Sequence, residues 1–117
     1  MTIRRLKTYT GSQGYVYQYY FVGKRPAADI SDAAEYVFDV TSDRKTTYAV
    51  SVILEHRVVA GWAEAHGRPL ADSEQYAAVK MRLFRAFDEV EDMQAKGRCL
   101  KVDSQLLEES LASLGVE

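Results

Sequence analysis

The segment YVYQYYFV, residues 15–22, has the clearest secondary-structure preference in this chain. All of its residues except Gln18 are aromatic or β-branched, the types that fit the pleated surface of a strand. Side chains alternate across a strand, so one face would carry Tyr15, Tyr17, Tyr19 and Phe21, and the other would carry Val16, Gln18, Tyr20 and Val22. The segment is predicted to be a strand with large side chains on both faces.

Three more segments around this strand have β character. Residues 2–9 precede it across the turn signal GSQG at 11–14, and residues 35–41 and 46–54 follow it, separated from each other by the polar turn SDRK at 42–45. Consecutive strands with short connections usually pair with each other. These segments therefore predict an antiparallel meander of four strands.

The second half of the chain has helical periodicity. We expect helices over residues 55–66, 73–95 and 104–114, with a short fifth strand over 98–102. Asp72 is a candidate N-cap for the long helix, and Gly97 is a natural stop after it. The apolar residues of that helix recur at spacings of three and four, at Tyr76, Val79, Leu83, Phe87 and Val90.

Strands followed by helices indicate an α+β fold. We expect an antiparallel sheet of four or five strands in the N-terminal half, packed by two or three C-terminal helices. The length of 117 residues favours a single domain over residues 1–117.

The compositional signals point to a cytoplasmic, soluble protein. There is one cysteine, and no apolar run approaches the roughly 20 residues that a membrane-spanning helix needs. The basic N-terminus is not followed by a run of signal-peptide length. We therefore expect no membrane association.

The charges are unevenly distributed, although the net charge is only −2. Residues 1–25 contain only basic charges, and residues 26–43 contain only acidic ones. The two segments either neutralise each other on neighbouring strands or leave a small basic patch for an anion or an acidic partner. The candidate basic patch consists of Arg4, Arg5, Lys7, Lys24 and Arg25.

No residue pattern identifies a catalytic or cofactor site. His56 and His66 are predicted to lie roughly 15 Å apart on one helix, too far to share a metal ion. Cys99 is expected to be a buried, inert thiol, and GSQG lacks the lysine and hydroxyl residue of a phosphate-binding loop. We therefore expect no cofactor and no metal, and an enzymatic role is the less favoured interpretation.

An acidic run near the end of the long helix, Asp88, Glu89, Glu91 and Asp92, is open to two interpretations. It could be a solvated helix face or a contact surface for a basic partner.

The tyrosine-rich strand suggests a function through binding. If the helices cover one face of the sheet, aromatic side chains on the other face remain for a partner, because tyrosine is enriched at interface hot spots. The candidate partner surface is Tyr15, Tyr17, Tyr19 and Phe21, with Val16 and Tyr20 as the alternative.

Three functional hypotheses follow. The first is a non-enzymatic protein-interaction or regulatory module that binds another protein or a second copy of itself. The second is a nucleic-acid-binding accessory protein that stacks bases on the tyrosine face and uses the basic N-terminal hairpin. The third is a small ligand-binding domain or enzyme with a site that the sequence does not reveal.

Overall fold

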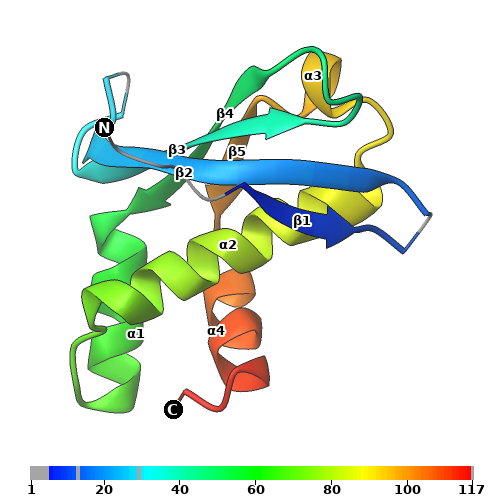
Figure 1. Cartoon of the computed structure of the whole chain (residues 1–117). Coiled ribbons are helices and arrows are strands. Elements are labelled where there is room, and N and C mark those ends of the chain that lie inside the picture. Colours follow the sequence, from blue (N-terminus) through cyan, green and yellow to red (C-terminus); the bar gives the residue numbers. More distant parts are fainter. Residues whose placement is uncertain (1–5, 13, 29, 117) are drawn as a thin grey trace.

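The computed structural model describes residues 6–12, 14–28 and 30–116 and has an α+β fold (Figure 1). Five strands and four helices follow one another in these residues as β1 (Lys7–Thr10), β2 (Val16–Pro26), β3 (Ala33–Thr41), β4 (Tyr48–Glu55), α1 (His56–His66), α2 (Asp72–Glu89), α3 (Met93–Lys96), β5 (Cys99–Val102) and α4 (Ser104–Ser113). The predicted division into an N-terminal sheet and C-terminal helices is confirmed.

The strands form one mixed sheet in the order β1-β2-β3-β4-β5. The first four strands pair in antiparallel fashion, as the meander prediction requires. The fifth strand is confirmed, but it pairs with β4 in parallel. A parallel neighbour needs a long crossover, and helices α1, α2 and α3 provide it.

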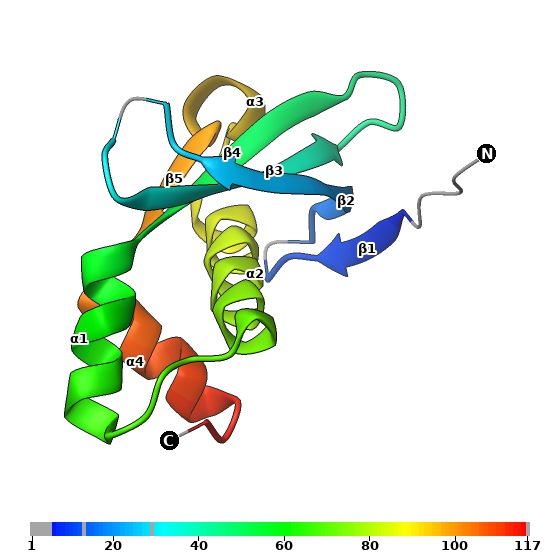
Figure 2. The same cartoon turned by 90° about the vertical axis from the view of Figure 1, so that its left-hand side faces the viewer.

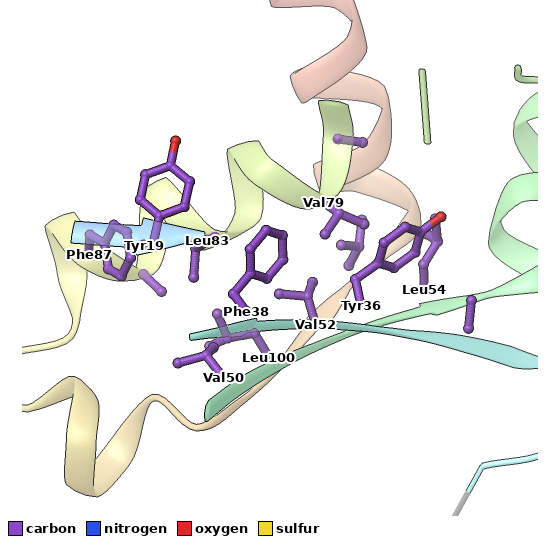
Figure 3. Packing of buried hydrophobic residues seen from close by; sticks show 14 of the residues in the cluster. Tyr19, Tyr36, Phe38, Val50, Val52, Leu54, Val79, Leu83, Phe87 and Leu100 are labelled. Atoms are coloured by element: carbon purple, nitrogen blue, oxygen red, sulfur yellow. The ribbon is translucent and has the colours of Figure 1, made fainter. Parts of the chain in front are cut away.

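Helices α1, α2 and α4 all lie on the same side of the sheet (Figures 1 and 2). Helix α2 packs on β4 and β5, and α4 packs on α1 and α2. Side chains of β3, β4 and β5 point from the sheet toward α2 and meet its Val79, Leu83 and Phe87 (Figure 3). The alternating side chains from Tyr48 to Leu54 and the apolar stripe of the long helix therefore build the core.

The boundaries of the early strands differ from the prediction. Strand β2 continues to Pro26, past the expected end at residue 22, with an irregular register between Phe21 and Gly23. A proline is tolerated at an edge or at a strand end, where its missing N–H breaks no ladder. For the predicted strand over 2–9, residues 7–9 belong to β1, and residues 2–5 lie outside the described part of the chain.

The predicted helix over 73–95 is divided in two. Helix α2 ends at Glu89 because Val90 is extended, and Asp92 then caps the short α3 by accepting a hydrogen bond from the Ala95 N–H at 3.2 Å. The N-cap position of α2 belongs to Ala71, not Asp72. Glu74, three residues further on, accepts a hydrogen bond from the Ala71 N–H at 2.9 Å.

The sheet face opposite the helices, called here the open face, has no covering layer of secondary structure among the described residues. Helix α4 does not reach it, because Leu107 and Leu111 are buried on the helical side. The β2–β3 connection lies near one end of this face, where Ala28 and Ile30 line a pocket together with Ile53. One exposed face is common in antiparallel sheets.

Candidate functional site

The four residues of the candidate partner surface do not form one exposed face. Tyr17 and Tyr19 are 3% and 4% exposed, and they lie under α2. The Tyr17 ring stacks on Phe87 with centroids 4.2 Å apart. Tyr15 and Phe21 are exposed, at 54% and 39%. The two central tyrosines are therefore part of the core and are unavailable to a partner.

The alternative pair, Val16 and Tyr20, lies on the open face. Val16 is exposed, and Tyr20 is half-buried with its hydroxyl donating a hydrogen bond to Asp39 Oδ2 at 2.6 Å. This face therefore presents some apolar surface, but it is interrupted by polar groups such as Gln18 and Asp39.

The residues of the candidate basic patch are also separated. Arg4 and Arg5 lie outside the described residues. Arg25 donates a hydrogen bond to Glu35 Oε1 at 2.8 Å from the neighbouring strand, which is the mutual neutralisation that the charge layout allowed. The Lys24 ammonium lies 5.4 Å from the Tyr36 ring centroid on the helical side of the sheet.

The structure brings together a different set of residues, on the outer side of α2. A small groove of about 210 Å³ lies between α2 and the end of α4. We call it the lysine–aromatic groove, and it is lined by Tyr76, Ala77, Lys80, Met81, Phe84 and Leu114. Phe21 extends the apolar surface beyond the groove, because its ring contacts Tyr76 with centroids 5.0 Å apart.

Lys80 occupies the middle of this groove. Residues four apart are neighbours on a helix surface, so Tyr76 and Phe84 flank Lys80 on one stripe of α2. The Lys80 ammonium lies 5.7 Å from the Tyr76 ring centroid and 5.8 Å from that of Phe84, within the range of a cation–π contact. Burial lowers the pKa of Lys80, and the positive charge of Lys7 nearby lowers it further.

Strand β1 forms the other border of the groove. Its Tyr9 ring stacks on Phe84 with centroids 4.5 Å apart, and its hydroxyl donates a hydrogen bond to Asp88 Oδ2 at 2.8 Å. Burial, followed by this hydrogen bond, raises the pKa of Tyr9 to about 12. Tyr9 therefore ties β1 to α2 and places Lys7 near Lys80.

A polar row crosses the open face. Ser51 donates a hydrogen bond to Glu35 Oε2 at 2.5 Å, and Arg25 donates to the other oxygen of the same carboxylate. The hydrogen bonds from Arg25 and Ser51 hold the pKa of Glu35 below its usual range. A carboxylate stabilised in this way is a weak base, so the row is suited to structure and not to activating the Ser51 hydroxyl.

The prediction that the Cys99 thiol is buried is wrong. The thiol is exposed, not buried, and lies beside Arg98 in a pocket of about 310 Å³ on the open face. Whether Cys99 is buried depends on which face of the sheet the helices cover. The alternation of side chains along a strand does not reveal which face that is. Leu100 faces the helices, so its neighbour Cys99 faces solvent.

His66 and members of the acidic run make contacts within the fold. His66 Nε2 lies 2.9 Å from both carboxylate oxygens of Glu108, and the His66 ring stacks on Trp62. Asp88 holds the β1–β2 hairpin through Tyr9 and the Ser12 N–H, and Arg85 pairs with Glu89. Within residues 6–12, 14–28 and 30–116, no three His, Cys, Asp or Glu side chains are grouped as metal ligands would be.

The sequence contains a signal for the groove, but the same signal also fits the edge of a purely structural core stripe. Tyr76, Lys80 and Phe84 recur at i, i+4 and i+8, and a lysine between two aromatic residues on one stripe marks the border of the buried face. The contributions of Leu114 and of β1 depend on tertiary structure and leave no such pattern.

Two further observations leave this description unchanged. None of the helices in the described part of the chain is both long and apolar enough to cross a bilayer. Comparisons with protein-family models, with curated proteins and with solved structures each find no match.

Proposed function

We propose that this chain is a non-enzymatic protein-interaction module and that the lysine–aromatic groove, together with Phe21, is its contact surface. The observation that carries the proposal is the clustering of uncovered apolar side chains there. Leu114 and Phe21 are 47% and 39% exposed, and Tyr76, Met81 and Phe84 are half-buried around them. Aromatic residues and methionine are enriched in the cores of protein interfaces.

The size of the groove supports a protein partner over a small ligand. Its volume of about 210 Å³ is below the range of roughly 300–1,000 Å³ that is typical of small-molecule sites. A groove of this size suits one anchoring side chain of a partner, with further contacts made by the surrounding surface.

Capture of partners from extracts of the producing cells tests the proposal. The immobilised wild type is compared with Leu114→Lys and Met81→Lys, which place a charge in the groove at positions that are not fully buried. The matched control is Val16→Lys, because Val16 is 43% exposed and lies on the open face. We expect the groove variants, but not the control, to lose the captured protein.

Two other results would contradict the proposal. Loss of capture by Val16→Lys alone would assign the contact to the open face. Absence of any selectively captured protein, with a monomeric wild type by light scattering at high concentration, would argue against an interaction module. A dimer that Leu114→Lys dissociates would identify the partner as a second copy of the chain.

A further inference from the structure

We infer that the groove selects an acidic amphipathic segment of another protein, whose apolar side chain enters the groove while its carboxylates meet Lys7 and Lys80. This inference rests on the proposed function and adds the chemistry of the partner. The charges around the groove support this inference, because the apolar lining alone would accept many kinds of partner.

Lys7 and Tyr9 share one face of β1, and the Tyr9 ring stacks on Phe84. The Lys80 ammonium lies over the same Phe84 ring, so both lysines lie beside this part of the groove. Across the described residues, ion pairs bind Arg25, Arg57, Arg68, Arg85 and Lys101 to glutamates, and none involves Lys7 or Lys80. Burial is the main cause of the lowered pKa of Lys80, and repulsion between its charge and that of Lys7 lowers this pKa further. The net charge of the chain is −2, so this positive region is a local feature.

An anion that approaches both lysines removes this unfavourable interaction. Asp88, which lies on the same stripe of α2 as Lys80 and Phe84, already accepts hydrogen bonds from Tyr9 and from the Ser12 N–H. A partner carboxylate would therefore supply a charge that the groove itself lacks. Complementary charge of this kind contributes mainly to specificity and to the rate of association.

The geometry favours an acidic peptide over a single-stranded nucleic acid. Base stacking requires free ring faces. Phe84 stacks on Tyr9 and also lies under the Lys80 ammonium, and Tyr76 is in contact with both Lys80 and Phe21. These contacts leave little ring surface for a nucleobase, whereas an aliphatic side chain needs only the apolar groove.

Two synthetic peptides provide the test. Both have leucines at i, i+3, i+4 and i+7, and all other positions are glutamate in one and lysine in the other. Each is titrated into the ¹⁵N-labelled protein at low salt, and amide chemical shifts are followed by NMR. We expect the glutamate peptide to shift resonances of residues 76–84 and of Leu114, and the lysine peptide to bind at least about tenfold more weakly.

Charge variants locate the effect. Lys80→Glu should weaken binding of the glutamate peptide by about tenfold, which corresponds to about 1.4 kcal/mol. Lys7→Glu, on an exposed position of β1, repeats the test without altering α2. Lys45→Glu is the matched control, because Lys45 is exposed in the β3–β4 turn and lines neither the groove nor the pocket beside Cys99. The control should leave binding unchanged.

The outcomes separate the two proposals. Equal binding of the two peptides overturns the acidic partner, while a protein captured through Leu114 still supports the interaction module. No shift of groove resonances by the glutamate peptide at millimolar concentration also overturns the acidic partner. An oligothymidylate that shifts the same residues more strongly than the glutamate peptide would assign the groove to nucleic acid.

Discussion

Glu74 illustrates how a single side chain links the folded structure to pH. Arg68 donates hydrogen bonds to both of its carboxylate oxygens at 3.0 Å, and these contacts, with the Ala71 N–H, lower the pKa of Glu74 to about 2 from an ordinary value of 4.5. The unfolded chain binds this proton more readily, so stability rises with pH between these values. The contribution of Glu74 is therefore complete above about pH 4.5 and is lost as the pH falls toward 2.

Glu74→Gln tests this dependence, because the amide oxygen can still accept the hydrogen bond from the Ala71 N–H but carries no charge. In urea unfolding between pH 2 and 6, we expect the variant to be less stable than the wild type at pH 6, with the difference vanishing toward pH 2. Glu64→Gln, at an exposed position of α1, should show no such trend. A difference that is constant across the range would contradict the ion-pair explanation.

At the scale of residues, the sequence predicted correctly which side chains share a strand face. It did not predict which of the two faces the helices cover. Tyr17 and Tyr19 do share a strand face, as expected, but that face is the one under α2. The same uncertainty explains why the prediction that Cys99 is buried was wrong. Alternation relates residues within one strand, whereas coverage depends on where a distant helix packs. The groove was missed for this reason, because Lys80 and Leu114 come from different helical segments and line one groove only after these have packed together.

Opposite effects of alanine are expected at two glycines, one within helix α1 and one directly after it. Gly61 is exposed within the helix, and a Cβ there would meet no atom within 4 Å, so Gly61→Ala should stabilise the protein by roughly 0.5–1 kcal/mol. Gly67 ends the helix with a φ of +73°, where its N–H donates to the Ala63 carbonyl. Gly67→Ala should destabilise the protein by about 1 kcal/mol, because this conformation strains an L-residue.

Each glycine variant serves as the control for the other, because each adds one methyl group, within α1 or directly after it. Thermal and urea unfolding measure the two changes. Destabilisation by Gly61→Ala would show that α1 needs the smaller residue for packing, contrary to the open space around this position.

At the scale of elements, the type and order of most elements and the antiparallel pairing of the first four strands could be predicted. The end of α2 and the direction of β5 could not. Helix boundaries were accurate for α1, where Gly67 marks the C-terminus, and inaccurate for α2, where no glycine or proline marks the end at Glu89. Strand β5 has too few residues for its sequence to reveal its direction. Its parallel pairing with β4 follows from the crossover through three helices, which is a property of the whole chain.

In the described part of the chain, one layer of helices packs on a five-stranded sheet, and the two faces of this sheet differ in character. The helical side contains the core and, at the border of α2, the lysine–aromatic groove. The open face is crossed by polar links such as the one between Arg25, Glu35 and Ser51. This distribution of apolar surface explains why we place the contact surface beside α2 and not on the uncovered sheet.

This architecture predicts an uneven distribution of local stability. Strands β3 and β4 are paired on both sides and contribute Phe38, Val50 and Val52, which are fully buried. Strand β1 is a short edge strand with one half-buried residue, Tyr9. Hydrogen exchange should therefore show β3 and β4 amides opening only with global unfolding, while β1 amides open locally at lower free energy.

Tyr9→Phe sharpens this prediction, because it keeps the ring that stacks on Phe84 and removes the hydroxyl that donates to Asp88. Loss of one hydrogen bond costs roughly 1 kcal/mol, so native-state exchange of β1 amides should accelerate about fivefold. Amides of β3 should accelerate by about the same factor, because global unfolding breaks this hydrogen bond too, but they should remain slower to exchange than those of β1. Unchanged exchange of β1 amides would contradict the role of this hydrogen bond. Equal opening free energies for β1 and β3 amides in the wild type would mean that the edge strand opens only when the whole molecule unfolds.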